Sequence, residues 1–78
     1  MTLYQFIALD EMEQQEAIWE GHLIDDREDT EYKILLYQID AFYVEVFHHK
    51  EHKVIKRYRP FTSVDQLAPY LNKLKISL

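Results

Sequence analysis

Three histidines, His48, His49 and His52, lie within a five-residue stretch and are the side chains best suited to bind a metal. Adjacent residues of a strand point to opposite faces, so His48 and His49 cannot converge, whereas His49 and His52 can meet across a turn. Two imidazoles fall short of the three or four protein ligands of a zinc site. We therefore expect no metal or cofactor, and instead a solvated, pH-sensitive hairpin tip.

The same region places basic residues among aromatic ones, as nucleic-acid-binding surfaces do. The basic residues are Lys50, Lys53, Lys56, Arg57 and Arg59. The net charge of the whole chain, however, is −5, and residues 1–31 carry ten acids against one base. This acidic half would repel phosphates, so nucleic acid is an unlikely partner and weak RNA binding is only an alternative.

The charge asymmetry has a second consequence. Residues 32–78 carry eight bases against four acids, so an acidic half is joined to a basic half. A dipolar surface of this kind can favour an electrostatically matched partner or head-to-tail self-contact. An alternative function is that the acidic residues 10–31 mimic nucleic-acid phosphates and inhibit a nucleic-acid-handling protein.

Five carboxylates are concentrated in residues 25–31, "DDREDTE", which raises the question of a calcium site. An EF-hand loop needs a glycine for its sharp turn, and this segment has none. We expect a solvated loop between strands. Catalytic machinery is not expected either: the chain has no cysteine, and its only glycine, Gly21, cannot make a glycine-rich phosphate loop or a nucleophile elbow.

The length and composition predict one folded domain over residues 1–78. Hydrophobic residues make up 47% of the 78 residues and aromatic ones 14%, which is too apolar for a disordered chain. A domain of this size can barely enclose a water-excluding cavity, so we expect the protein to have no enzymatic activity. No apolar run approaches the ~20 residues of a membrane span, and the start lacks signal-peptide features. These features and the absence of cysteine predict a cytoplasmic protein without membrane contact.

Helical signals flank the middle of the chain. Asp10 and Glu13 form an acidic capping box that predicts a helix over about 10–19, closed by Gly21, after a short helical turn bent at residues 9–10. Near the other end, Ser63 and Gln66 have capping-box spacing, and Pro69 predicts a kink. The apolar stripe of this second helix would consist of Val64, Leu67, Leu71 and Leu74.

Between the helices lie segments rich in β-branched and aromatic residues: 31–39, 41–49 and 53–61, preceded by a weaker candidate at 22–25. The predicted fold class is α+β: an N-terminal helix, a three- to four-stranded antiparallel meander, and a C-terminal helix kinked at Pro69. The element order resembles that of the double-stranded RNA-binding domain, but the basic cluster that opens the last helix in that family is absent.

Matching of cross-strand side chains predicts a register for the last hairpin. With residues 50–51 at the tip, one face receives an apolar, an ionic and an aromatic pair. These pairs are Phe47 with Val54, Glu45 with Lys56, and Tyr43 with Tyr58. The opposite face then carries Phe42, Val44, Val46 and Ile55, with Arg57 and Arg59 toward one end.

Both helical segments most simply cover the sheet face with Val44, Val46 and Ile55, which leaves the other face open. Depending on how residues 31–39 pair, the open face gains Ile34 and Leu36, or Leu35 and Tyr37. The competing possibility is that one helix crosses to this face and the patch is core.

A contiguous exposed apolar surface usually marks an interface. We therefore predict a small protein-interaction domain that binds itself, as a homodimer, or another protein through the open sheet face. The predicted interface consists of Tyr43, Glu45, Phe47, Val54, Lys56 and Tyr58.

Three segments, "LDEMEQQEAIWEG", "DREDTEYKILLYQIDAFYVEV" and "PYLNKL", resemble short uncharacterised proteins of Bacteroides-type bacteria. The resemblance spans nearly the whole chain and implies a bacterial, cytoplasmic setting. It implies no activity, ligand or catalytic residue.

Overall fold

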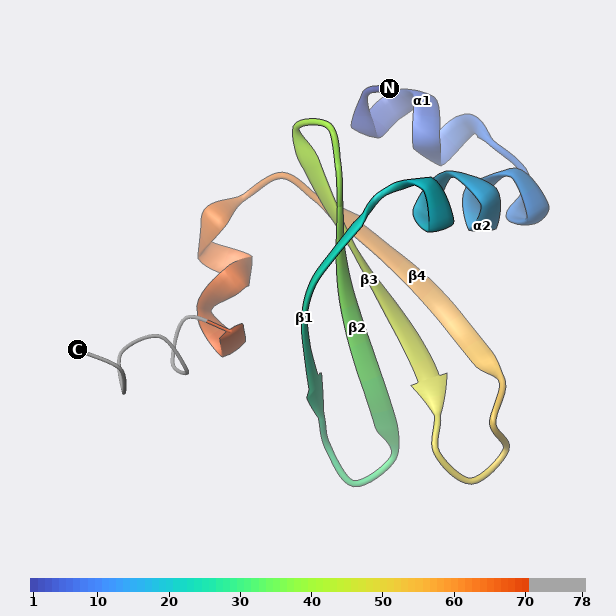
Figure 1. Cartoon of the computed structure of the whole chain (residues 1–78), viewed down its shortest axis with the longest axis vertical. Coiled ribbons are helices and arrows are strands. Elements are labelled where there is room, and N and C mark those ends of the chain that lie inside the picture. The colour runs from blue at the N-terminus through green and yellow to red at the C-terminus, as the bar shows by residue number, and fades with distance from the viewer. Residues whose placement is uncertain (71–78) are drawn as a thin grey trace.

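The structure is a computed structural model that describes residues 1–70 of the chain. Two helices, α1 (Leu3–Ala8) and α2 (Glu11–Glu20), precede four strands, and a short 3₁₀ helix, η1 (Val64–Leu67), follows them. The strands are β1 (His22–Glu28), β2 (Tyr32–Ile39), β3 (Phe42–His49) and β4 (Ile55–Phe61) (Figure 1). The predicted α+β fold with an antiparallel meander is confirmed. None of the helices within residues 1–70 is long and apolar enough to cross a membrane.

The N-terminal helices form where capping residues start them. Thr2 and Gln5 make a reciprocal capping box for α1, and Asp10 and Glu13 make another for α2. Between them Leu9 is extended, with ψ of 154°, which produces the predicted bend. Gly21 ends α2 with a φ of −78°, an angle that other residues also adopt, so the backbone conformation does not require a glycine there. It is needed for close packing, because a Cβ atom there would lie 2.7 Å from the carbonyl oxygen of Gln38.

The sheet order is β1-β2-β3-β4, with each strand antiparallel to the next. A two-residue turn joins β2 to β3, and its Asp40 has a φ of 51°, a region that aspartate tolerates better than most residues. β1 extends beyond the predicted 22–25, because residues 26–28 of the acidic segment also belong to it and not to a loop. The turn after β1 is held by the Asp29 carboxylate, which accepts hydrogen bonds from the amides of Glu31 and Tyr32.

The predicted register of the β3–β4 hairpin is wrong. Glu45 lies opposite Arg59 and not Lys56, Phe47 lies opposite Arg57, and Tyr43 lies opposite Phe61. The offset of three residues is odd, so it moves the side chains of β4 to the other face of the sheet. A longer loop causes it: the His49 amide donates to the Val54 carbonyl, and Lys53 adopts a φ of 56°.

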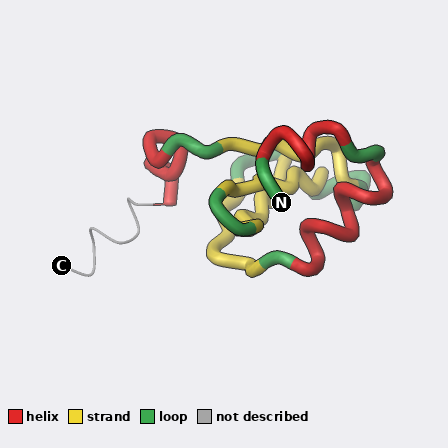
Figure 2. The backbone as a smooth tube through the Cα atoms, turned by 90° about the horizontal axis from the view of Figure 1, so that it is seen from above, coloured by secondary structure: helices red, strands yellow, loops and turns green. Residues whose placement is uncertain are grey.

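The helices lie on opposite faces of the sheet, so the prediction that both cover one face is also wrong (Figure 2). We call the first the α2 face: there Phe6 and Ile18 of the N-terminal helices pack on Ile39, Phe42 and Val44. We call the second the Tyr70 face: there Leu67 and Tyr70 pack against Leu36, Tyr43 and Phe61. Ile34 and Leu36 lie on the Tyr70 face, which is one of the two pairings expected for β2.

The C-terminal helical segment differs from its predicted pattern. The Ser63 hydroxyl caps η1 by accepting from the Asp65 amide, but Gln66 accepts from Arg59 at 2.6 Å and does not complete a capping box. Val64, predicted to face the sheet, is exposed. Helical structure continues over residues 68–70. Leu71, Leu74 and the course of the helix beyond the kink predicted at Pro69 lie outside the described residues.

Candidate functional site

The six residues of the predicted interface do not form one open surface. Tyr43, Glu45 and Phe47 lie on the Tyr70 face, where Glu45 and Phe47 are buried. Tyr58 packs with the core of the α2 face. Val54 is exposed before the start of β4, and a shift in strand pairing leaves Lys56 without a cross-strand partner. For Tyr43, Glu45 and Phe47 the competing possibility therefore applies: a helical segment covers this face and they pack beneath it.

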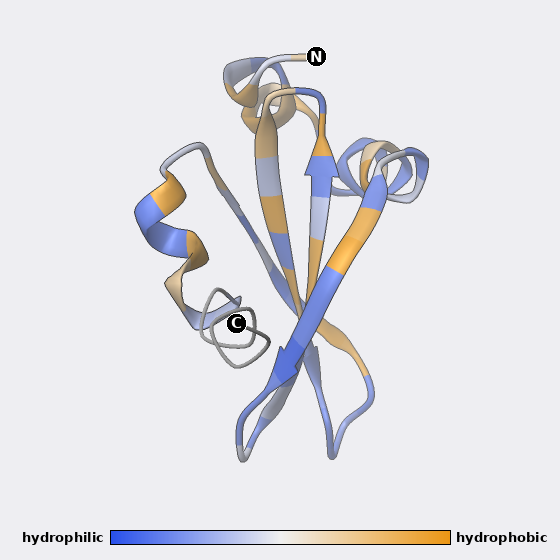
Figure 3. Ribbon diagram, turned by 60° about the vertical axis from the view of Figure 1, so that its left-hand side comes forward, coloured by the Kyte–Doolittle hydropathy of each residue, from blue (hydrophilic) through white to orange (hydrophobic). Residues whose placement is uncertain are grey.

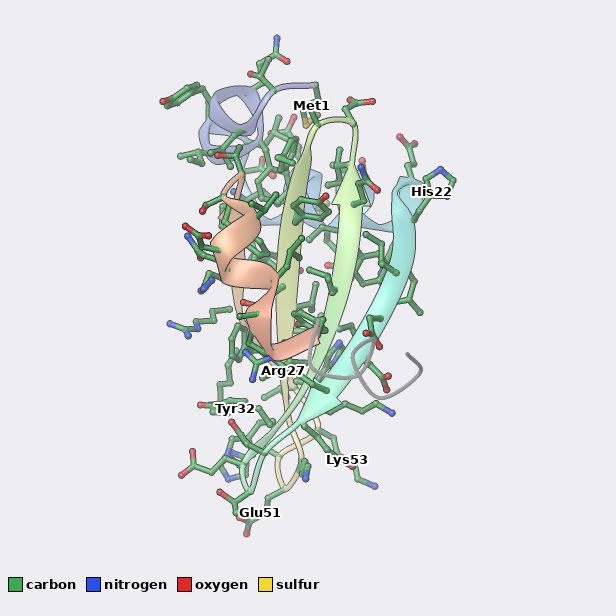
Figure 4. The ribbon with its side chains drawn as sticks, turned by 90° about the vertical axis from the view of Figure 1, so that its left-hand side faces the viewer. Met1, His22, Arg27, Tyr32, Glu51 and Lys53 are labelled. Atoms are coloured by element: carbon green, nitrogen blue, oxygen red, sulfur yellow. The ribbon has the colours of Figure 1, made fainter. Side chains whose placement is uncertain are left out.

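Glu45 is the centre of a buried polar cluster on the Tyr70 face, with only 1% of its surface exposed. Its Oε2 accepts a hydrogen bond from the Tyr70 hydroxyl at 2.7 Å and another from Nη2 of Arg27 at 3.0 Å. Nη1 of Arg59 lies 3.1 Å from Oε1 but outside hydrogen-bond geometry, so that contact is electrostatic. In Figure 4 the C-terminal helical segment lies in front of the strands, and Arg27 lies beside its end.

The surroundings of this cluster shift two pKa values. Burial raises the pKa of Tyr70 far above its ordinary value, and the hydrogen bond to the Glu45 carboxylate raises it further. Desolvation lowers the pKa of Arg27, but its hydrogen bonds with Tyr70 and Glu45 outweigh that effect and the net pKa is raised. Tyr70 and Arg27 therefore both stay protonated at neutral pH.

The contacts of the Glu45 cluster hold separate parts of the fold together. Both oxygens of the carboxylate already face protein groups, and none of these side chains is an activated nucleophile. The cluster joins β1, β3, β4 and the helical residue Tyr70. Reasoning from the sequence missed this cluster, although a signal was present: an acid in the middle of an apolar strand must find partners if it is buried.

A second site, the α2 groove, is open. α2 crosses only the end of the sheet near the β2–β3 turn, and the rest of the α2 face extends beyond it toward the other two hairpins (Figure 1). A cavity of about 120 Å³ lies in the angle between helix and sheet. It is lined by Gln15, Ile18 and Trp19 of α2 and by Leu35, Tyr37, Val46, His48, Ile55 and Tyr58 of the sheet.

The α2 groove combines apolar walls with polar groups that lack partners within residues 1–70. No hydrogen bond is made there by the side chains of Gln15, Trp19, Tyr37, His48 or Tyr58. Burial, and to a lesser degree the charge of Glu11, raises the pKa of Tyr58, whose side chain forms part of the groove wall. A mainly apolar concavity with a few free polar groups is typical of a binding site.

The two ends of the α2 groove differ in charge. Toward the hairpin tips it continues into a shallow depression that shares Leu35 and His48 and is otherwise lined by His49 and three lysines. These lysines are Lys33, Lys50 and Lys53. The helix α2, which forms the wall away from the hairpin tips, exposes Glu11, Glu16 and Glu20. Figure 3 shows the hairpin ends as predominantly hydrophilic.

One prediction about the histidines is confirmed: His49 and His52 converge at the hairpin tip. His49 and His52 meet across the turn, with their rings stacked 4.3 Å apart and the His52 amide donating to Nδ1 of His49 at 3.1 Å. His48 points to the other face and lines the α2 groove. In the described part of the chain, no three histidine, cysteine, aspartate or glutamate residues are grouped so that they could hold a metal ion.

Comparisons of the chain with protein-family models, with curated proteins and with solved structures found no match.

Proposed function

We propose that the protein is a non-enzymatic protein-interaction domain of the cytoplasm and that its binding surface is the α2 groove. This proposal keeps the function predicted from the sequence but moves it to the opposite face of the sheet. Its main support is the uncovered part of the α2 face, where Leu35, Tyr37, Ile55 and Tyr58 are only partly buried.

The volume of the α2 groove favours a protein partner over a free metabolite. Pockets for drug-sized molecules usually measure about 300 to 1,000 Å³. The cavity here measures about 120 Å³, close to the ~150 Å³ that accommodates one benzene ring in an engineered protein core. One large side chain of a partner fits such a space, and the surrounding open sheet can contact the rest of that partner.

Trp19 is the residue best placed to dominate binding. It lies at the rim of the groove with 65% of its surface exposed, and it is the only tryptophan of the chain. Tryptophan is enriched among the few interface residues that contribute most of a binding energy. Its indole also makes fluorescence a direct report on whether this rim becomes covered.

Affinity capture from a native lysate tests the proposal when it compares three forms of the protein. Trp19→Ala removes the rim residue, and Tyr4→Ala is the matched control, because Tyr4 is another helical aromatic residue with 81% exposure. We expect wild type and Tyr4→Ala to capture the same protein, and Trp19→Ala to bind it at least ~30-fold more weakly by titration calorimetry. Equal binding by all three forms would refute the groove as the site.

The acidic-inhibitor alternative has one supporting observation, the exposed acids of α2. Glu13, Glu16 and Glu20 lie at spacings of three and four residues, so they share one helical stripe. If this stripe mimics phosphates, the protein competes with DNA for a basic partner, and Glu16→Gln with Glu20→Gln weakens the competition. Captured proteins that bind no nucleic acid would count against this alternative.

Weak RNA binding has less support. Lys50 is paired with Glu28 at 2.9 Å and Lys33 with Asp26 at 3.8 Å, so two of the lysines at the basic end are already partly neutralised. We expect no gel shift with RNA at low micromolar protein and about 150 mM salt.

A further inference from the structure

We propose that the α2 groove is occupied by a second copy of the same chain, in a two-fold symmetric dimer that packs the two α2 faces against each other. The two-fold axis lies in the interface and runs across the strands. This inference rests on the proposed function and names the partner of that same groove.

Charge supplies the first argument for this partner. The groove is bounded on one side by α2, which exposes Glu11 and Glu16, and it extends on the other side toward Lys33 and Lys53. Within the described residues, Glu11, Glu16 and Lys53 make no ion pair, so they are available to a partner. Lys33 lies 3.8 Å from Asp26 at an exposed position, so this weak surface pair can be exchanged for one with a partner. An isologous interface brings a patch against itself, and a two-fold axis across the strands places the acidic end of each copy on the basic end of the other. The surface is therefore complementary in charge to its own copy, and the dimer contains two symmetry-related contacts of this kind.

The shape of the molecule selects the same axis. α2 projects from one end of the sheet, while the opposite end of the α2 face is bare (Figures 1 and 3). A two-fold axis parallel to the strands would bring helix against helix, hold the sheets apart and oppose like charges. An axis across the strands places each helix beyond the bare end of the other sheet, so the two apolar surfaces can meet.

The dimer also accounts for the exposed groups of the groove. Trp19 of each copy reaches the partner's Leu35 and Ile55 beyond the helix, which removes a large aromatic surface from water. The hydroxyls of Tyr37 and Tyr58 lie near the axis, where they can bond to each other or to trapped water, as polar groups of interfaces commonly do.

Charge reversal tests this arrangement sharply. The acid-end variant is Glu11→Lys with Glu16→Lys, and the base-end variant is Lys33→Glu with Lys53→Glu; all four residues are exposed. Asp65→Lys, a reversal at an exposed residue of η1, is the control. Circular dichroism checks that each variant folds, and sedimentation equilibrium at low salt measures the mass.

We expect wild type and Asp65→Lys to sediment at twice the chain mass at ~100 micromolar. Each double variant opposes like charges at both ends of its own dimer, so its dissociation constant should rise at least about tenfold. An equal mixture of the two double variants has opposite charges at both ends and should restore the dimer.

Three results would overturn the inference: a monomeric wild type at ~100 micromolar, a reversal variant that dimerises as well as wild type, or a mixture that stays monomeric. The proposed function is judged separately. If wild type is monomeric but Trp19→Ala loses capture of another protein, the groove is a binding site and its partner is foreign.

Discussion

Replacing Tyr70 by phenylalanine should measure how strongly the C-terminal helical residues are held on the Tyr70 face. The substitution removes one hydroxyl and keeps the ring that packs against Leu36 and Phe61. The lost interaction is the 2.7 Å hydrogen bond to Oε2 of the buried Glu45. Hydrogen bonds to charged groups contribute about 1.5 to 3 kcal/mol to stability.

The remaining contacts of Glu45 place the expected loss at the lower end of that range. Arg27 still donates to the same oxygen at 3.0 Å, and Arg59 stays 3.1 Å from the other, so the carboxylate is not left without partners. We therefore expect a loss of about 1.5 kcal/mol in the free energy of unfolding. For a domain of this size this corresponds to a drop in Tm of roughly 6 to 12 °C.

Urea and thermal denaturation followed by circular dichroism give both values. Tyr4→Phe is the matched control, because it removes the same atom from an exposed ring whose hydroxyl has no hydrogen bond within residues 1–70, and its stability should stay within about 0.5 kcal/mol of wild type. If Tyr70→Phe is as stable as this control, the Glu45 cluster does not anchor the helical segment.

The raised pKa of Tyr70 adds a pH dependence with a definite sign. The folded protein retains the phenol proton at pH values where the unfolded chain, with a tyrosine pKa of about 10, has lost it. The stabilisation is complete below about pH 10 and decreases as the pH rises above it. Tyr70→Phe should lose stability less steeply than wild type above pH 10; the slope should not vanish, because the pKa of Tyr58 is raised too.

Two further predictions concern other parts of the chain. Gly21→Ala should destabilise the protein by about 1 to 3 kcal/mol in urea denaturation, because the new Cβ would lie 2.7 Å from a backbone oxygen; unchanged stability would show that the helix end relaxes freely. Zinc should bind no more tightly than about micromolar in isothermal titration, because only His49 and His52 converge; tight one-to-one binding lost in His49→Ala with His52→Ala would contradict this.

Local signals in the sequence predict the first half of the fold well. The bend after α1, the start of α2 at Asp10 and its end at Gly21 all follow from contacts between residues a few positions apart. The strands β2 and β3 follow from their β-branched and aromatic residues and from the short polar break between them. Such features depend on neighbouring residues alone, so one sequence is enough to find them.

The length of β1 could not be predicted in the same way. Residues 25–28 have poor strand propensity, and they pair because Arg27 reaches the buried Glu45, 18 positions along the chain. Tyr70, 25 positions from Glu45, is brought to the same carboxylate by tertiary packing. Partners at such separations carry no local signature, so the sequence shows an acid within an apolar strand without showing that it is buried or what neutralises it.

The location of the proposed binding surface depends on a single choice of register. The predicted and observed pairings of β3 with β4 each bring an acid opposite a base and an aromatic residue opposite Tyr43, so side-chain matching cannot choose between them. The observed pairing stacks Tyr43 on Phe61 at 5.5 Å and places Arg57 over the ring of Phe47 at 4.3 Å.

Glu45 gives the observed register its advantage. In this register Arg59 of β4 lies 3.1 Å from Oε1 of Glu45, while Arg27 of β1 lies 3.0 Å from Oε2, so each oxygen of the buried carboxylate has a cation beside it. The same register moves Tyr58 to the α2 face, where it becomes a wall of the α2 groove. The ion pairs that bury Glu45 on one face thus determine which side chains are left open on the other.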